Sequence, residues 1–196
     1  KKQTNLVNNP GFEVMEAAQT KAPKKVFDYA VNWDIWAEND DNTQLFVTDT
    51  ARNGSYGFAF VNTAKHASSL TQYVTGLKKG SYVLSAYVRS SGGQEDAALL
   101  AKGYDKENPA GQSGAKILKS GIWTRVELEF EVTSGQVQIS LWNAGNEGNW
   151  IVIDQVELVA KDDATYTNLL KNGSFEQAEG GQWNDSSFID GILSIV

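Results

Sequence analysis

A strict alternation of apolar and charged residues most constrains what this chain can fold into. In residues 125–132, RVELEFEV, the apolar residues Val126, Leu128, Phe130 and Val132 alternate with Arg and Glu. A period of two places all apolar side chains on one face of a strand and all charged ones on the other. We therefore expect a strand with one face toward a core and the other toward water.

Other segments show the same alternation, or the continuous apolar run of a strand that is covered on both sides. They are residues 44–49, 56–62, 69–76, 81–90, 96–105, 136–143 and 150–159. Clusters of Gly, Asn, Ser and Asp separate them, as turns do. Residues 13–22 are the best helix candidate, but they lack a cap and a period-3.6 stripe, so we expect a loop or a single turn there. The sequence predicts an all-β fold, an antiparallel two-sheet β-sandwich.

Composition excludes several classes of protein. The net charge is −7 and the basic residues are scattered, which argues against binding to nucleic acid or to an anionic membrane surface. The absence of Cys excludes a disulfide framework, a thiol nucleophile and a thiolate zinc site. No apolar run reaches the roughly 18 residues that a membrane span needs, so we expect no membrane insertion.

The chain repeats its beginning near its end. NLVNNPGFE at residues 5–13 and NLLKNGSFE at residues 168–176 share Asn, Leu, Asn, Phe and Glu at the same positions. The simplest explanation is one module over residues 1–160, a linker at 161–167, and the start of a second, truncated or vestigial repeat at 168–196. The second copy is too short to form a sandwich by itself.

A set of segments in a fixed order resembles a known family. NLVNNPGFE, a Trp some 20 residues later, NGSYGFAF, SLTQYVTGLKKGSYVLSAYVRSSGG, GIWTRVELEFEVTSGQVQISLWN and WIVIDQVELV follow one another along the chain. Together they resemble carbohydrate-binding modules of the family 4/9 type, related to families 16 and 22. The resemblance implies a galactose-binding-like β-jelly roll in a secreted protein that acts on polysaccharide.

The resemblance also implies a structural Ca²⁺ held by Glu13 and Asp154, with backbone oxygens near residues 53–55 as further ligands. Calcium takes about six to eight hard oxygen ligands, and a carboxylate on a buried strand needs a counter-charge. The alternative is that Glu13 caps a turn and that Asp154 pairs with a Lys or Arg.

Aromatic residues at outward strand positions are candidates for sugar contact, since sugar rings have apolar C–H faces and hydroxyl edges. Tyr87 and Arg89 share one outward strand face, and Trp142, followed by Asn143, lies in another strand. Trp36 is expected to be exposed on a loop, where it would line a ligand cleft. The alternative for Tyr87 and Trp142 is that loops cover them and that they belong to the core.

The remaining aromatic residues have mainly structural interpretations. Trp33 matches the family Trp that seals the end of the sandwich, so we expect it in the core. Trp123 begins a strand and is expected to pack. Trp150 precedes the last strand, where either role is open, and Tyr104 is a candidate at a loop edge.

An enzyme is the more distant interpretation. Glu127, Glu129 and Glu131 project from one strand face roughly 7 Å apart, a spacing within the range of an inverting glycosidase pair. A catalytic acid and base usually come from opposite sides of a cleft, however, so a solvated strand face is the better explanation. The single histidine, His66, is expected on a surface loop, and no nucleophile or phosphate-binding motif is present.

The sequence therefore favours a non-catalytic module that binds a poly- or oligosaccharide and targets an attached enzyme or a cell surface. We expect it to be extracellular or at the cell surface, and to be a monomer or part of a larger multidomain chain. The alternative is a structural or protein-interaction β-sandwich of an exported multidomain protein, with no sugar site.

Overall fold

The computed structural model describes residues 4–14, 30, 32–38 and 43–161, which lie in one compact unit, Lys2–Asp162. This part of the chain forms ten strands. They are β1 (Asp34–Ala37), β2 (Thr43–Thr48), β3 (Gly57–Asn62), β4 (His66–Thr75), β5 (Gly80–Ser90), β6 (Asp96–Lys102), β7 (Gln112–Lys116), β8 (Ser120–Val132), β9 (Gln136–Gly145) and β10 (Trp150–Ala160). A search of the described residues finds no helix with the length and apolar character that crossing a membrane requires.

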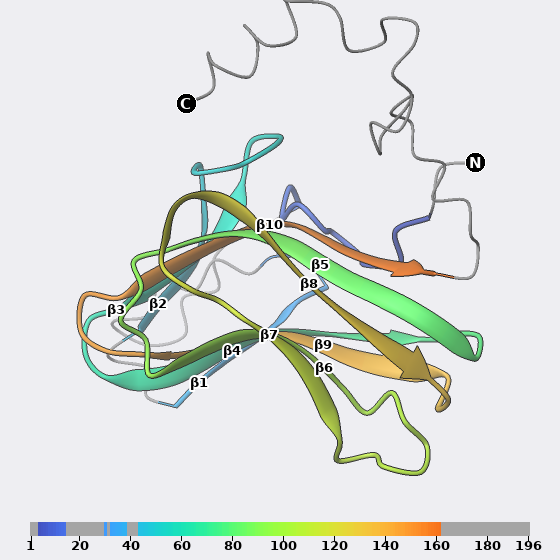
Figure 1. Ribbon diagram of the computed structural model, residues 1–196. Coiled ribbons are helices and arrows are strands. Elements are labelled where there is room, and N and C mark those ends of the chain that lie inside the picture. The colour runs from blue at the N-terminus through green and yellow to red at the C-terminus, as the bar shows by residue number, and fades with distance from the viewer. Residues whose placement is uncertain (1–3, 15–29, 31, 39–42, 162–196) are drawn as a thin grey trace, which may run out of the picture. The chain divides into compact units, whose positions relative to one another are not determined.

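The strands form two five-stranded sheets that lie one above the other (Figure 1). Sheet I has the order β1-β4-β9-β6-β7, and sheet II has the order β2-β3-β10-β5-β8. Every strand pairing in both sheets is antiparallel. The antiparallel two-sheet β-sandwich expected from the sequence is confirmed.

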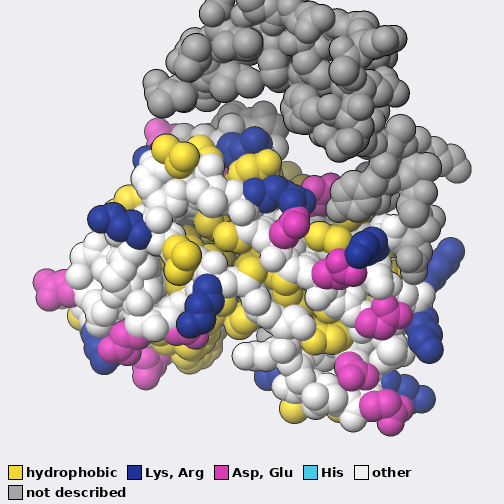
Figure 2. Space-filling model, in the orientation of Figure 1, with side chains coloured by type: hydrophobic (Ala, Val, Ile, Leu, Met, Phe, Trp, Pro, Cys, Tyr) yellow, Lys and Arg dark blue, Asp and Glu magenta, His cyan; other side chains and the backbone are white. Residues whose placement is uncertain are grey.

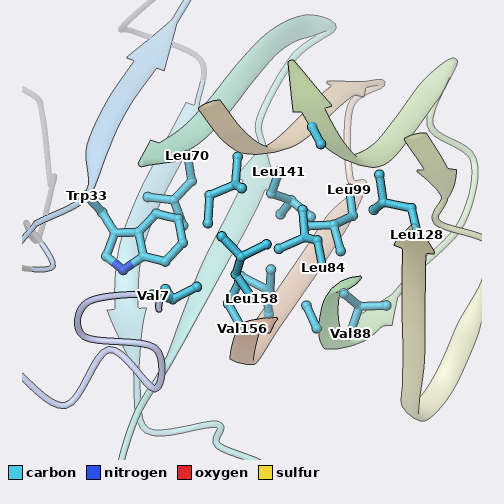
Figure 3. Packing of buried hydrophobic residues seen from close by; sticks show 14 of the residues in the cluster. Val7, Trp33, Leu70, Leu84, Val88, Leu99, Leu128, Leu141, Val156 and Leu158 are labelled. Atoms are coloured by element: carbon cyan, nitrogen blue, oxygen red, sulfur yellow. The ribbon is translucent and has the colours of Figure 1, made fainter. Parts of the chain in front are cut away.

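The core lies between the two sheets and contains the apolar residues that the alternation assigns to the inner faces (Figure 3). Sheet I contributes Leu70, Leu99 and Leu141, and sheet II contributes Leu84 and Leu158 among others. In β8, Leu128, Phe130 and Val132 point inward, whereas the Glu residues between them are exposed. Burial of such side chains is the main favourable term for a sandwich of this kind.

The predicted segments correspond to β2 to β6 and β8 to β10. Two strands, β1 and β7, were not expected: β1 was interpreted as loop, and β7, QSGAK, has no apolar alternation. Of the predicted loop at 13–22 only Glu13 and Val14 are described. The predicted linker and second repeat, 161–196, lie outside the described residues except for Lys161.

The segment of residues 5–13 is held against β10. The side chain of Asn5 donates to the Val156 carbonyl at 3.0 Å and accepts from the Leu158 amide at 3.0 Å, while the Leu6 amide donates to the Leu158 carbonyl. Phe12 is fully buried in the core. The residues shared by the two copies of this motif therefore hold the N-terminal segment to the sandwich in the first copy.

Strand β10 contains an irregularity between Asp154 and Glu157, and Gln155 has a positive φ of 50°. Ile151 and Ile153 point into the core before it, and Val156 and Leu158 point into the core after it. The extra residue explains why the inward positions change from odd to even numbers within β10, since the alternation shifts by one position there.

Candidate functional site

Two Trp residues meet on the outward face of sheet I. In the strand register, Trp36 of β1 is opposite Ser69 of β4, and Ser69 is opposite Trp142 of β9. Side chains of residues that pair in this way lie on the same face. The two indole rings are nearly parallel, with an interplanar angle of 15° and centroids 6.0 Å apart. Because Ser69 is small, rings from strands on either side of it can meet above it.

The part of the outward face of sheet I that we call the Trp face consists of three neighbouring rows that cross the strands. The first contains Trp36, Ser69, Trp142, Ala98 and Lys116. The second contains Asp34, Thr71, Ser140, Leu100 and Gly114, and the third contains Tyr73, Gln138, Lys102 and Gln112. Trp36 is 50% exposed and Tyr73 is 63% exposed.

The second row supplies hydroxyl groups between the aromatic rings. Thr71 Oγ1 and Ser140 Oγ form a hydrogen bond of 2.9 Å across β4 and β9. Hydroxyls both donate and accept, so this pair keeps capacity for a further partner. A flat aromatic area beside neutral hydroxyl and amide groups can bind a ring that has an apolar face and a polar edge.

Asn143 does not belong to this face. It is buried, and its amide nitrogen donates to Asn62 Oδ1 at 2.8 Å and to Ser68 Oγ at 3.3 Å. The expectation that it contacts a ligand beside Trp142 is wrong, because consecutive residues of a strand point to opposite faces.

Tyr87 and Arg89 lie in β5, on the outward face of sheet II and thus on the opposite side of the sandwich from Trp142. The guanidinium of Arg52 lies 3.5 Å from the centroid of the Tyr87 ring, and Arg89 Nε donates to the Gly121 carbonyl at 3.0 Å. Tyr87 and Arg89, which the sequence offered as sugar contacts along with Trp142, therefore do not share a face with it. Alternation distinguishes inward from outward positions, but it does not say to which sheet a strand belongs.

Tyr73 is the surface aromatic that sequence reasoning missed. It lies in β4 two positions beyond Thr71, on the Trp face. The signal was present in SLTQYVT, where Leu70, Gln72 and Val74 are buried and the residues between them point outward.

The other aromatic residues are mainly structural. Trp33 is buried in the core, as expected, and its Nε1 donates to the Asn9 carbonyl. Trp123 and Trp150 are half-buried. Tyr104 packs against Phe130 and its hydroxyl bonds to Ser113 Oγ at 2.7 Å.

His66 is not on a surface loop, as the sequence suggested, but is buried as the first residue of β4. Its Nδ1 lies 3.2 Å from the Ala64 carbonyl, which requires the proton to be on that nitrogen. Burial lowers the pKa of His66, while the Ala64 carbonyl and the charge of Glu38 oppose this shift.

Glu13 and Asp154 lie close to each other at sheet II, to which Asp154 of β10 belongs. A β-carbon added to Gly11 would be 3.6 Å from both Asp154 Oδ1 and Glu13 Cγ. Glu13 Oε1 accepts the amides of Ser55 and Tyr56, each at 3.0 Å. The amides of Arg52, Asn53 and Gln155 donate to Asp154. The loop of residues 52–56 thus presents its N–H groups to both carboxylates.

Asp154 is fully buried, and burial raises the pKa of its carboxyl group. The amides of Asn53, Arg52 and Gln155 oppose this rise, and the negative charge of Glu13 adds to it. The alternative, in which Asp154 pairs with a Lys or Arg side chain, is not seen among the described residues. Two adjacent carboxylates without a side-chain cation offer hard oxygen ligands to a cation. The loop that was expected to add backbone oxygens near residues 53–55 instead directs amide N–H groups at both carboxylates.

Charged side chains of both signs are interspersed on the side of the molecule shown in Figure 2, and no broad basic surface lies there. The described residues also contain no cluster of three or more His, Cys, Asp or Glu that could bind a metal ion. The Trp face combines an exposed aromatic ring with uncharged polar groups, a combination that suits a neutral ligand.

The strand topology places the chain in a structural class, the antiparallel two-sheet β-sandwich. Neither a protein-family model nor a curated protein matches the sequence. Solved structures do match. TmCBM61, determined with β-1,4-galactotriose, is 20% identical with a TM-score of 0.61, over 80% of this chain and 99% of that chain.

Two further matches have similar coverage. A protein of Bacteroides thetaiotaomicron named for sugar binding is 19% identical, with a TM-score of 0.57 over 81% of this chain and 100% of that chain. The CBM22-1 xylan-binding domain of Paenibacillus barcinonensis Xyn10C is 12% identical, with a TM-score of 0.54 over 82% and 96%. The fold that the sequence resemblance implied is confirmed.

Proposed function

We propose that this chain is a non-catalytic carbohydrate-binding module that binds a poly- or oligosaccharide on its Trp face. The observation that carries the proposal is the stacked pair of Trp36 and Trp142, which lies on an outward face. An exposed indole ring costs free energy in water unless a ligand covers it. A sugar ring stacked on the pair would gain apolar contact and keep its hydroxyls available for hydrogen bonds.

The surroundings of the pair support a neutral ligand. Ser69, Thr71 and Ser140 are small and carry hydroxyls, and Gln138 adds an amide in the next row. Asp34 on β1 and Lys102 and Lys116 on β6 and β7 are spread over the face rather than clustered. These three charges do not produce an electrostatic potential of a single sign, which binding of a charged polymer would require.

The similar structures support the same function, since one was solved with β-1,4-galactotriose and another is named a xylan-binding domain. In this role the chain would be secreted or on the cell surface and would hold an attached enzyme or cell at its polysaccharide. If the repeat that starts at residue 168 belongs to a complete second module, that module would raise the overall affinity through effective concentration.

We also propose that Glu13 and Asp154 hold a structural Ca²⁺. The ion would supply the counter-charge for two adjacent carboxylates and would fix the loop of residues 52–56 to β10. The test is thermal unfolding in Ca²⁺ and in EDTA. We expect EDTA to lower the Tm of the wild type but not that of Glu13→Gln. Equal Tm values for the wild type in both buffers would exclude the ion.

The binding proposal is tested by isothermal titration calorimetry with soluble xylan, glucan, mannan and galactan. For the polymer that binds, Trp142→Ala and Trp36→Ala should each weaken binding by about tenfold or more, as removal of an aromatic anchor does. Ile122→Ala, which truncates a 76% exposed residue of β8 in sheet II, is the control and should bind normally.

Tyr87→Ala distinguishes the two faces of the sandwich. Unchanged binding by this variant is expected, because Tyr87 lies under Arg52 on the other sheet. Loss of binding in Tyr87→Ala, with Trp142→Ala unaffected, would show that the Trp face is the wrong surface. A folded protein that binds none of the polymers would instead favour an interaction module without a sugar site.

A further inference from the structure

Tyr73 is a second large aromatic residue on the Trp face, and packing does not account for its position. Its side chain is 63% exposed, although it belongs to a ten-residue strand, β4, that pairs with β9 along its whole length. Among the described residues its hydroxyl has no hydrogen-bond partner. A ring on the same face as the Trp pair can stack on the same ligand if that ligand is long enough to reach it.

The distance between Tyr73 and the Trp pair follows from the strand geometry. The Trp rings meet above Ser69, and Tyr73 is four residues further along β4 on the same face. Four residues of an extended strand cover about 13 Å. This distance is longer than the distance between the two ring centres of a disaccharide. One disaccharide therefore cannot stack on both the Trp pair and Tyr73.

On β4 and β9, the outward residues between the two aromatic positions are small and polar. Thr71 and Ser140 lie there as a hydrogen-bonded hydroxyl pair, and Gln138 is directly opposite Tyr73 in the register. Small hydroxyl side chains do not block a ligand that lies along β4 and β9. Thr71 is buried, whereas Ser140 is half-buried, so of this pair it is Ser140 that can donate to or accept from a sugar hydroxyl.

We propose that Tyr73 is a second stacking position and that the Trp face selects an extended chain of about three or four pyranose units or more, lying along β4 and β9. This inference rests on the proposed function of the Trp face. Its ligand is a neutral polysaccharide chain bound over several units, not a monosaccharide or a disaccharide. Stacking at two separated places requires a ligand that is long and straight enough to reach both.

The test uses oligosaccharides from disaccharide to hexasaccharide of the polymer that binds, measured by calorimetry. For the wild type, affinity should rise steeply between disaccharide and tetrasaccharide and then level off. Tyr73→Ala should weaken tetrasaccharide binding by about tenfold and leave disaccharide binding unchanged. Tyr73→Phe keeps the ring without the hydroxyl and should retain most of the affinity.

Because Tyr73 is exposed, its replacement should not unfold the protein, and an unchanged Tm verifies this. Affinity that levels off at the disaccharide would overturn the inference, as would a Tyr73→Ala variant that binds every length normally. So would equal weakening at all lengths, since that would place Tyr73 at the same position as the Trp pair. If the wild type binds no oligosaccharide at all, the proposed function fails first and the inference with it.

Discussion

In the loop of residues 52–56, Gly54 has no β-carbon, and this leaves room for the carboxylate of Glu13. Gly54 has a φ of +74°, and a β-carbon added there would lie 2.3 Å from Glu13 Oε1. Gly76 has nearly the same φ of +73°, with nothing within 4 Å of an added β-carbon. Gly54→Ala and Gly76→Ala therefore share a backbone penalty and differ in the contact with Glu13.

The expected magnitudes follow from these two terms. A residue with a β-carbon in the left-handed region costs about 1–2 kcal/mol, so Gly76→Ala should lose about 1 kcal/mol. In Gly54→Ala the carboxylate must also move, which breaks its hydrogen bonds to the amides of Ser55 and Tyr56. Each such bond contributes about 1 kcal/mol at an exposed site. The total for Gly54→Ala is then about 3 kcal/mol.

The assay is urea unfolding followed by tryptophan fluorescence, with EDTA present so that no bound cation contributes. The difference of about 2 kcal/mol between the variants corresponds to roughly 4–8 °C in Tm for a domain of this size. Equal losses in the two variants would refute the reasoning, because they would show that Glu13 adapts at no cost. Near-ultraviolet circular dichroism of both variants verifies that the core is intact.

Two further predictions concern buried polar groups. Because burial lowers the pKa of His66, the unfolded chain binds its proton more readily, so the free energy of unfolding should fall as the pH drops from 7 through about 6.5 and below. His66→Asn keeps a donor for the Ala64 carbonyl but has no titrating ring, so it should lose this part of the pH dependence in urea titrations. Identical pH profiles for the wild type and this variant would contradict the prediction. Asn143→Ala should destabilise the protein by about 1–3 kcal/mol in the same assay and leave sugar affinity unchanged, because its amide bonds Asn62 in the interior. Trp142→Ala, one residue away, should show the reverse pattern, and similar effects of both variants would contradict the assigned faces.

Sequence reasoning predicted the inner faces of the strands well, since alternation is a local property. Leu128, Phe130 and Val132 point inward as expected. Strands β1 and β7 were missed for a physical reason: each is short, and neither shows an apolar alternation that a buried inner face would produce. The burial of His66 was not predicted, because the small and polar residues that follow it in β4 do not show which side chains point inward.

The candidate site depends on pairing between distant segments, which alternation does not encode. Trp36 and Trp142 meet because β4 pairs with both β1 and β9. Tyr87 and Arg89 have the same outward pattern as Trp142, but their strand belongs to the other sheet. A correct list of outward aromatic residues therefore still left open which of them share a surface.

The pairing of residues 5–10 with β10 has a mechanical consequence. This segment runs antiparallel to β10, because Leu6 bonds Leu158 while Pro10 bonds Val156. Chain that continues before residue 4 and after residue 161 therefore leaves the sandwich at neighbouring points. Tension applied through both ends would open the hydrogen bonds between the segment and β10 one after another, as in a zipper, instead of loading them together. Under such a pull the N-terminal segment would peel away first, while the Trp face on the other sheet stayed intact.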